Sequence, residues 1–479
     1  MATRAVNRRD AIRGAVSLVS CWAGNAILPS TILAEGEQPV QVKVDEDHLL
    51  GPISADFMGL GYEVSSVANP GLLSGSNHVY VQLIRTLSRN GVIRVGGATS
   101  DYARYSTEGK LVSSPKSTVI NKQCLKDLGS FLDATGWRLI WGLNLGQGSQ
   151  SEAVEEARAV SAAVGMKLLA FEIGNEVDIF GGRHRQKGYS FDDYLGEYRN
   201  YKSAIRAALP NAPFAGPDAA IRNEWVSQFA AAEGRDLRLL TEHYYRAGQN
   251  ASSSLEMLFR PDPKLAPMLQ TLQSTSSSSK LPFRICETNS FSGGGKPGVS
   301  DTFGAALWVL DYMWTLASFD ASGVNMETGV NHLGFISSYS PIGESQGATV
   351  SATPEYYGML AFSRASGGQR ALVRTVAGEL NLSAYAAVDG HKIQVTVINK
   401  ERTTSCKVSL TCNARIAKAS AMRLSGPSFE SKVGVTLGGS QVSADGRWKP
   451  HEEERLTISA KGAELIVPSG SAAVVTLRL

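Results

Sequence analysis

The chain is poor in cysteine and has no cluster of residues spaced like a metal site. It contains five cysteines in 479 residues, and two of them, Cys406 and Cys412, are six residues apart in a strand-like stretch. Fully extended, that stretch would hold them about 20 Å apart, which excludes a disulfide unless the chain turns between them. The sequence also has no nucleotide-binding loop and no redox motif. We therefore expect no disulfide framework, no metal and no cofactor.

Long hydrophobic runs are also missing. No stretch of 18 uninterrupted apolar residues exists, so no transmembrane helix is expected. Residues 1–34 instead resemble a twin-arginine export signal, because Arg8-Arg9 precedes a mostly apolar, uncharged run from Ala15 to Leu33. Export would place the protein in the periplasm or outside the cell. The residues up to Cys21 also resemble a lipoprotein cleavage box, so a lipid anchor on Cys21 is the alternative.

The third deficit is net charge. The chain has 47 basic and 44 acidic residues, and removal of residues 1–34 takes away four basic residues and one acidic residue, which leaves the two signs in balance. A protein without a global field does not attract nucleic acid or a polyanion through its surface as a whole. Nucleic acid is therefore not an expected partner, and any acidic ligand must be recognised locally.

From Phe57 onward, short apolar runs alternate with longer segments of helical periodicity, which is typical of parallel strands joined by helices. Eight runs have strand length: Phe57–Tyr62, Val92–Gly97, Arg138–Leu145, Leu168–Gly174, Pro213–Pro217, Leu237–His243, Pro282–Cys286 and Gly323–Met326. Helices are expected at Ser151–Val164, Phe191–Leu209, Leu265–Thr275, Asp301–Ser318 and Pro354–Arg364. This alternation predicts an α/β fold, a closed (β/α)8 TIM barrel over residues 52–366. A doubly wound open sheet is the alternative, but it would need a glycine-rich turn after the first strand.

The pattern changes after the expected barrel. Alternating or β-branched segments such as Lys392–Val397 follow, separated by Gly, Ser, Asn and Asp. They predict a second, smaller all-β sandwich domain over residues 367–479. Val40–Asp45, ahead of the barrel, alternates in the same way. We expect residues 38–50 to pair with the C-terminal strands, which makes this domain discontinuous.

Two of the expected barrel strands end in glutamate. The fourth strand finishes with Asn175-Glu176 and the seventh with Glu287. Because the active site of a (β/α)8 barrel lies at the carboxyl ends of its strands, both carboxyls are expected at the same opening. Two carboxyls about 5–5.5 Å apart suit a glycosidase in which one protonates the leaving oxygen and the other attacks the anomeric carbon. Glu172 is a competitor, but its deeper position favours a paired structural charge.

Other polar residues follow strands at the same end of the barrel. The sixth strand ends with His243-Tyr244-Tyr245, where a tyrosine could donate to the nucleophile or could simply pack under a loop. Asp101 follows the second strand and could bind sugar hydroxyls. The loop after Glu176 contains four basic residues that either line a cleft or are solvated: Arg183, His184, Arg185 and Lys187.

Together these residues resemble glycoside hydrolase family 79, the β-glucuronidase and heparanase family, from about Phe57 to the end of the chain. The matching segments are Phe171–Glu176, Ala212–Asp218, His243–Tyr245, Glu287–Ser290, Gly293–Lys296 and Pro354–Met359. The resemblance implies a retaining exo-β-glucuronidase with Glu176 as acid/base and Glu287 as nucleophile. It also implies that Asn175 binds the sugar 2-hydroxyl and Tyr245 contacts the nucleophile. We also expect His243 to be one of the residues that bind the sugar.

The loop after the seventh strand resembles the one whose backbone amides receive the glucuronate carboxylate, and it contains Gly293, Gly294, Gly295 and Lys296. A protein without a broad basic surface needs such a local nest of N–H groups. The resemblance also implies a tyrosine near the carboxylate after the eighth strand, but Gly329–Gly334 has none at that point. His332 or Tyr339 is the expected substitute.

The expected partner is a glucuronide or a uronate-containing glycan, and three alternatives stay open. An endo-β-glucuronidase of heparanase type, acting on acidic polysaccharide, is favoured if the basic loop lines a cleft. A neutral-sugar glycosidase would share the two glutamates without needing the carboxylate site. A non-catalytic carbohydrate-binding barrel is the third, although such a relic would be free to lose either glutamate.

Overall fold

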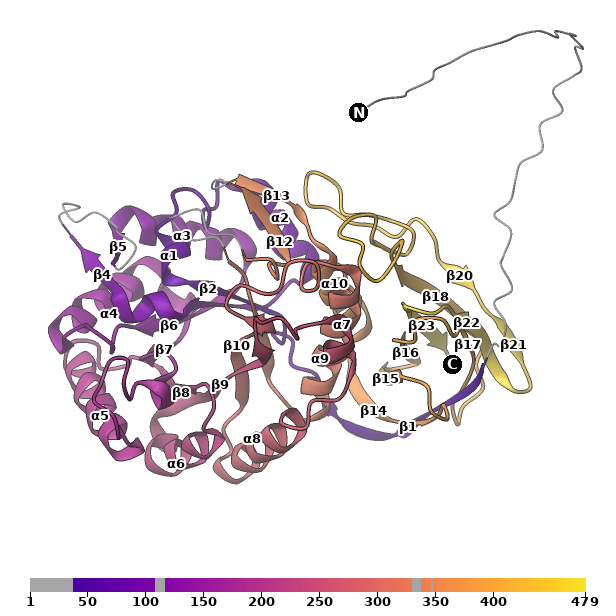
Figure 1. The fold of residues 1–479 in the computed structure, drawn as a ribbon, viewed down its shortest axis with the longest axis horizontal. Helices are drawn as coiled ribbons and strands as arrows, with labels where there is room; N and C mark the ends of the chain where they lie inside the picture. The colour runs from indigo at the N-terminus through magenta and orange to yellow at the C-terminus, as the bar shows by residue number, and fades with distance from the viewer. Residues whose placement is uncertain (1–37, 108–116, 330–336, 346–347) are drawn as a thin grey trace, which may run out of the picture. The chain divides into compact units, whose positions relative to one another are not determined.

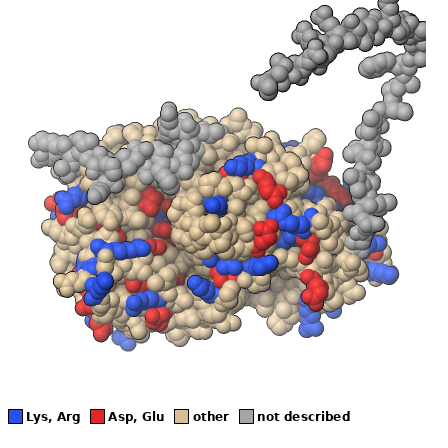
Figure 2. All heavy atoms as spheres, viewed as in Figure 1, with Lys and Arg blue, Asp and Glu red and all other residues tan. Residues whose placement is uncertain are grey.

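The computed structural model describes residues 38–107, 117–329, 337–345 and 348–479. The expected export signal, Cys21 and His332 lie outside these ranges. Among the described helices, none combines the length and the apolar content that crossing a bilayer requires. Figure 2 shows acidic and basic side chains intermixed over one face of the protein, without a broad patch of either sign on that face.

Eight parallel strands close into a barrel, which confirms the fold predicted from the sequence (Figure 1). The strands are β2 (Gly59–Glu63), β3 (Val92–Gly96), β6 (Arg138–Leu143), β7 (Leu168–Ile173), β8 (Phe214–Ala219), β9 (Leu237–Gly248), β10 (Phe283–Ser292) and β11 (Gly323–Glu327). They neighbour one another in chain order, and β11 closes the ring by pairing with β2. Because all strands are parallel, their carboxyl ends meet at one opening.

Helices surround the barrel strands (Figure 1). The longer ones are α2 (His78–Leu87), α3 (Lys122–Thr135), α4 (Gln150–Val164), α5 (Phe191–Ala208), α6 (Asn223–Glu233), α8 (Leu265–Ser279), α9 (Phe303–Ser318) and α10 (Pro354–Ala365). All five helices expected from the sequence are present. The prediction for α4 was one residue late, because Ser149 caps the helix in a reciprocal capping box with Glu152. Shorter elements are α1 (Val64–Val67), α7 (Leu255–Phe259), β4 (Ala103–Ser106), β5 (Thr118–Asn121), β12 (Ile342–Ser345) and β13 (Ala348–Ala352).

Side chains that point into the barrel form layers. One apolar layer takes one residue from each of six strands: Val92, Ile140, Ala170, Ala215, Leu239 and Cys286. On three of those strands, the apolar residue is followed two or three positions later by a buried charged one: Arg94, Glu172 and Asp218. The charged layer therefore lies nearer the carboxyl ends, where a barrel builds its active site.

The C-terminal residues form a second β-sheet region. Its strands are β1 (Gln38–Pro52), β14 (Gln369–Val376), β15 (Leu382–Asp389), β16 (Lys392–Asn399), β17 (Cys406–Thr411), β18 (Lys418–Ser425), β19 (Thr436–Leu437), β20 (Glu454–Arg455), β21 (Thr457–Ser459), β22 (Gly462–Val467) and β23 (Ser471–Arg478). The structure places β1 between β14 and β17. These strands hydrogen-bond as one 11-stranded sheet, and apolar residues from separate parts of it, such as Val395 and Val408, share a single core, which is consistent with the expected β-sandwich domain.

The sheet region packs against α9 of the barrel. The Trp314 ring stacks on Tyr385 with ring centroids 5.4 Å apart, and its indole nitrogen donates to Thr396 at 3.1 Å. Beside them, the Lys400 ammonium pairs with Asp311 at 2.5 Å. These contacts attach the sheet to the helix that connects β10 and β11, two of the strands that carry the candidate site.

Candidate active site

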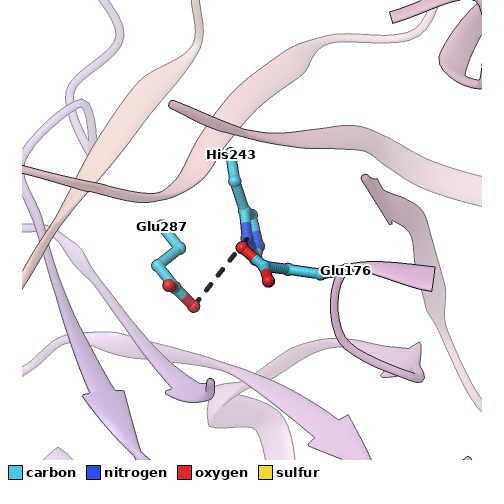
Figure 3. Close-up of side chains that lie close together, drawn as sticks. All are labelled: Glu176, His243 and Glu287. Carbon is cyan, nitrogen blue, oxygen red and sulfur yellow. Dashed lines mark ion pairs between the residues drawn. The ribbon is translucent and has the colours of Figure 1, made fainter. Parts of the chain in front are cut away.

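Glu176 and Glu287 approach each other at the open end of the barrel (Figure 3). One carboxylate oxygen of each lies within 4.8 Å of the other, and a ring nitrogen of His243 lies within the same distance of both. The Glu176 side chain is 22% exposed and the Glu287 side chain is 10% exposed. Both glutamates can therefore contact a ligand that enters the opening.

Backbone features at the two strand ends aim these carboxylates inward. Glu176 has a φ of 53°, which is uncommon for a residue with a side chain, and its amide donates to the Asp218 carbonyl at 2.9 Å. In β10, the pairing register shifts between Ile285 and Glu287. Such a bulge re-aims the side chain that follows it. Local strain and a bulge beside two facing carboxylates are typical of a functional site.

Arg94 lies beneath the pair and was not anticipated. Its fully buried guanidinium donates to Glu172 at 3.1 Å, to Asp218 at 2.5 Å and to Glu287 at 2.8 Å. It also donates to the side-chain oxygen of Asn175 at 2.9 Å. The planar fork thus connects four strands and fixes both Asn175 and Glu287. The sequence did contain a signal, because an arginine inside an apolar strand must be paired when it is buried.

His243 lies beside Glu287 in the register of β9 and β10, and its ring is buried with 1% exposure. It was expected among the sugar-binding residues but does not line the cavity described below. Its Nε2 is 2.7 Å from Asp218, and its Nδ1 is 3.6 Å from Glu176 and 3.8 Å from Glu287. Burial would lower the pKa of His243, but the charges of Asp218 and Glu287 outweigh burial and raise it well above its usual value. The acidic neighbours therefore favour the protonated form of the ring.

The surroundings of Glu176 favour its charged form in the free protein. Burial raises the pKa of Glu176, but the positive charge favoured on the nearby His243 ring outweighs burial, and the charge of Arg183 adds to its effect. The net result is a pKa below the usual value. The nearest Arg183 nitrogen is 3.6 Å away, and that side chain is 63% exposed.

Tyr245 holds the second oxygen of Glu287. Its hydroxyl donates to Oε1 at 3.0 Å, while Arg94 donates to Oε2, so both carboxylate oxygens are fixed. Tyr244, the alternative left open by the sequence, donates instead to Asp262 at 2.8 Å. Of the two tyrosines, it is therefore Tyr245 that contacts the glutamate.

A cavity of about 360 Å³ opens above these residues. Its walls include Asn175, Glu176, Tyr245, Glu287, Gly293, Gly294 and Tyr339. Gly293 and Gly294 have φ values of 81° and 89°, and among the described residues no backbone acceptor engages their amides. The Gly294 carbonyl accepts from the Ser338 amide at 2.7 Å, which holds the loop in place. Tyr339, one of the two expected substitutes, stacks on Tyr245 with centroids 6.3 Å apart.

Besides His243, three further residues expected to bind substrate do not line this cavity. The Gly295 amide donates to the Phe291 carbonyl at 3.1 Å, and the Lys296 amide donates to the Ser300 hydroxyl at 2.8 Å. Asp101 is buried and accepts from the Gly146 amide at 2.9 Å. The backbone amides of Gly295 and Lys296 and the carboxylate of Asp101 thus take part in internal hydrogen bonds that hold neighbouring loops.

The basic loop after Glu176 contributes less to the opening than its sequence suggested. Arg185 pairs with Glu197 at 2.8 Å and donates to the carbonyls of Leu145 and Gly146. His184 packs against Phe180 with ring centroids 4.8 Å apart. Of the four basic side chains, Arg183 is therefore the one beside the glutamate pair, and Lys187 is exposed.

Two further glutamates line the cavity and were missed. Glu63, at the end of β2, accepts from the amide and the hydroxyl of Thr99 at 2.7 and 2.6 Å. Burial, together with the charge of Glu287, raises the pKa of Glu63 to about 7. Glu327 ends β11. The rule that identified Glu287, a polar residue at the end of an apolar strand, applies to both positions and would have found them.

Glu176, His243 and Glu287 also have the spacing of a metal ligand set. A metal requires a neutral imidazole, whereas the pKa of His243 is raised by its acidic neighbours. A protonated His243 ring would attract the two carboxylates and repel a metal cation.

Comparison with known proteins identifies two named relatives. No family profile matches the chain. A β-glucuronidase of Aspergillus niger is 26% identical over 408 residues, which cover 75% of this chain and 74% of that protein. A β-glucuronidase of Neurospora crassa is 27% identical over 379 residues, which cover 67% of this chain and 65% of that protein.

Solved structures share the fold. A 4-O-α-L-rhamnosyl-β-D-glucuronidase of Fusarium oxysporum superposes with a TM-score of 0.74 at 19% identity, covering 92% of this chain and 100% of that one. An α-L-arabinofuranosidase of Thermotoga maritima gives a TM-score of 0.67 at 15% identity, with coverage of 92% and 100%. The relatives and the facing glutamates argue against the alternative of a non-catalytic carbohydrate-binding barrel. The protein is a glycoside hydrolase.

Proposed function

We propose that the protein is a retaining exo-β-glucuronidase that releases β-linked glucuronic acid from glucuronides or oligosaccharides. The observation that carries the proposal is the approach of Glu176 and Glu287 to within 4.8 Å at the open end of a barrel. Retaining glycosidases hold their carboxyls about 5–5.5 Å apart, whereas inverting enzymes need about 6.5–9.5 Å to admit a water. The activity named for the two relatives supports glucuronate as the sugar.

The reaction would proceed by double displacement. Glu287 attacks the anomeric carbon while Glu176 protonates the glycosidic oxygen, so the aglycone leaves with that proton. Glu176 then takes a proton from water, whose oxygen attacks the same carbon and frees Glu287. Asn175, held by Arg94, would bind the sugar 2-hydroxyl.

Glu176 must carry a proton when the aglycone departs, although its pKa is lowered in the free protein. An aglycone that displaces water and the exposed Arg183 side chain would move the Arg183 charge away from Glu176. The aglycone would also bury the Glu176 carboxyl further. Both changes raise the pKa of a carboxyl. Substrate binding would therefore prepare Glu176 for its role as acid.

The uronate carboxylate would bind at Gly293 and Gly294. Their amides face no described backbone acceptor. Because glycine has no side chain, an anion can approach these amides closely. Tyr339 lines the same cavity and would take the place of the tyrosine missing from Gly329–Gly334.

Hydrolysis of an aryl β-glucuronide, followed by proton NMR during the first minutes, tests the proposal. Retention predicts that β-glucuronic acid appears first and then mutarotates. An α product would contradict double displacement. A glucuronate-configured covalent inactivator should add its mass to the peptide that contains Glu287.

Exo and endo action are separated by the products of size-defined uronate oligosaccharides. The proposal predicts release of single glucuronate units from the non-reducing end. The structural contacts of Arg185 and His184 support exo action, because they remove two charges from the expected polysaccharide cleft. Early appearance of internal fragments would instead establish the heparanase-type alternative.

One observation favours a second candidate, a neutral-sugar glycosidase. The described cavity walls contain no lysine or arginine but four glutamates: Glu63, Glu176, Glu287 and Glu327. Such a lining repels an anionic sugar unless some of these acids carry protons. Faster hydrolysis of an aryl β-glucoside than of the matching glucuronide would establish this candidate.

Replacing Tyr245 by Phe is expected to lower kcat by about 10- to 100-fold, because Glu287 loses a hydrogen bond worth about 1.5–3 kcal/mol. The matched control is Tyr244→Phe, which removes the neighbouring hydroxyl from Asp262, outside the cavity. Steady-state kinetics on an aryl glucuronide measures both. Equal losses in the two variants would argue against a specific role for Tyr245.

Replacing Arg183 by Gln is expected to move the alkaline limb of the kcat/KM profile to higher pH. The Arg183 charge lowers the pKa of Glu176, so its loss raises that pKa and lets the acid form persist. Because the side chain is 63% exposed, the shift should be larger in low salt than in high salt. Lys187→Gln, on the same loop, serves as the control, and a shift to lower pH in Arg183→Gln would refute the pairing.

A further inference from the structure

Glu327 is a buried carboxylic group whose two oxygens have no hydrogen-bond partner among the described residues. The residue is 3% exposed and lines the cavity above the glutamate pair. Leaving a buried polar group unsatisfied costs about 1–3 kcal/mol, and more when the group is charged. A group retained at this cost inside a ligand cavity is expected to meet its partner when the ligand binds.

The backbone around Glu327 is fixed while its carboxyl is left free. The Asn289 amide group donates to the Glu327 carbonyl at 3.2 Å, which holds the end of β11 against β10. On the other side lies Gly61 of β2, where an added Cβ would collide with Oε2 of Glu327. The missing side chain at position 61 thus makes room for the carboxyl. The backbone of Glu327 is therefore held in place, while its carboxyl group forms no hydrogen bond within the described residues.

The charges around Glu327 favour its neutral form. Burial is the largest cause and raises the pKa of Glu327, and the charges of Glu287 and Glu63 raise it further. Arg94 and His243 act in the opposite sense but are engaged by other carboxylates, and the net pKa lies well above the usual value. The titratable groups that face Glu327 are Glu63, Arg94, His243, Tyr245, Glu287 and Tyr339.

We propose that Glu327 binds the substrate as a neutral acid and donates a hydrogen bond to the carboxylate of the bound uronate. This inference rests on the proposed glucuronidase function and deepens it. A protonated carboxyl has one O–H donor, and its bond to an anionic oxygen is shorter and roughly twice as strong as a bond between neutral groups. It also resolves the conflict between an acid-rich cavity and an anionic sugar, because the proton turns a repelling group into an attracting one.

The proposal makes uronate recognition acid-dependent. Below the raised pKa of Glu327 the donor is present. Above that pKa the donor is lost, and a second negative charge faces the uronate. The affinity for glucuronate should therefore fall as pH rises through this pKa, whereas the affinity for a neutral sugar should not fall with it.

The test measures Ki for free glucuronate and for glucose, across mildly acidic to alkaline pH, in the full chain and in Glu327→Gln. In wild type, Ki for glucuronate should rise by about tenfold per pH unit above the pKa of Glu327. Glutamine is neutral and a donor at every pH, so Glu327→Gln should keep Ki within about threefold at low pH and lack this rise. The other facing groups titrate in both proteins, so the difference between them isolates Glu327.

Glu327→Ala provides the complementary result, an increase in Ki for glucuronate of about 10- to 100-fold with a smaller change for glucose. Glu242→Gln is the matched control, because Glu242 is also a buried, unpartnered glutamate among the described residues but does not line the cavity. Identical pH profiles in wild type and Glu327→Gln would overturn the inference. Failure of wild type to hydrolyse any glucuronide would instead overturn the proposed function.

Discussion

Glu287→Gln is expected to lower kcat on an aryl β-glucuronide by on the order of 10⁴-fold or more. The amide keeps the shape of the carboxyl but cannot form the glycosyl–enzyme bond, so the first displacement is lost. The fold should persist, because Tyr245 and Arg94 still enclose a side chain of the same size. Steady-state kinetics and thermal unfolding of the same preparation measure both properties.

The matched control is Glu156→Gln. Glu156 is also buried, accepts from the Trp141 indole at 2.9 Å, and has a pKa raised by burial to about 8. It is therefore already neutral at neutral pH, and an amide should leave kcat almost unchanged. Full hydrolysis by Glu287→Gln would refute the nucleophile, whereas equal losses in both variants would point to a general effect on the fold.

Azide separates the roles of the two glutamates. In Glu287→Ala, azide can occupy the vacated space and attack from the side of the missing nucleophile, so an α-glucuronosyl azide is expected. In Glu176→Ala, the covalent intermediate still forms from an activated aryl substrate, and azide should release it as the β-azide. Azides of the same configuration from both variants would contradict the assignment of the pair.

Arg94→Met is expected to lower the free energy of unfolding by about 3–5 kcal/mol and to remove most activity. Methionine fills much of the space but leaves Glu172, Asp218 and Glu287 without the cation that all three share. Their charges would then lie buried and poorly compensated. Urea denaturation of the full chain measures the loss, and Arg94→Lys should fall between wild type and Arg94→Met, because an ammonium cannot reproduce the planar fork.

Arg138→Met is the control for that experiment. Arg138 pairs with Asp56 at a position where 45% of its side chain is exposed, so its loss should cost less than about 1 kcal/mol. If Arg94→Met unfolded at the same denaturant concentration as Arg138→Met, the buried network would not stabilise the fold to the extent that its geometry indicates.

The barrel could be predicted because its signals are local. Each strand is a short apolar run between helices, and parallel strands place all their ends at one opening, so Glu176 and Glu287 could be paired from strand ends alone. The same rule, applied to the first and eighth strands, would also have identified Glu63 and Glu327. Their omission was a failure to extend the rule and not a limit of the sequence.

Other features depend on contacts that no local pattern encodes. Arg94 reaches three acids from three other strands, and which acids it meets depends on the relative register of the barrel strands. Gly295 and Lys296 belong to the expected loop, but internal hydrogen bonds turn their amides away from the cavity. Likewise, alternation predicts strands but not whether they join into two sheets or one, because that depends on which edges find each other.

The position of β1 couples the two ends of the polypeptide. Residues Gln38–Pro52 are made early in synthesis, yet they form an interior strand between β14 and β17, whose residues are made more than 300 positions later. The ribosome must therefore release nearly the whole chain before this sheet can be completed, and long-range closure of this kind slows folding. Removing β1 alone would leave β14 and β17 with unpaired edges. Removing β14 and β17 to isolate the barrel would instead leave β1 without its neighbours.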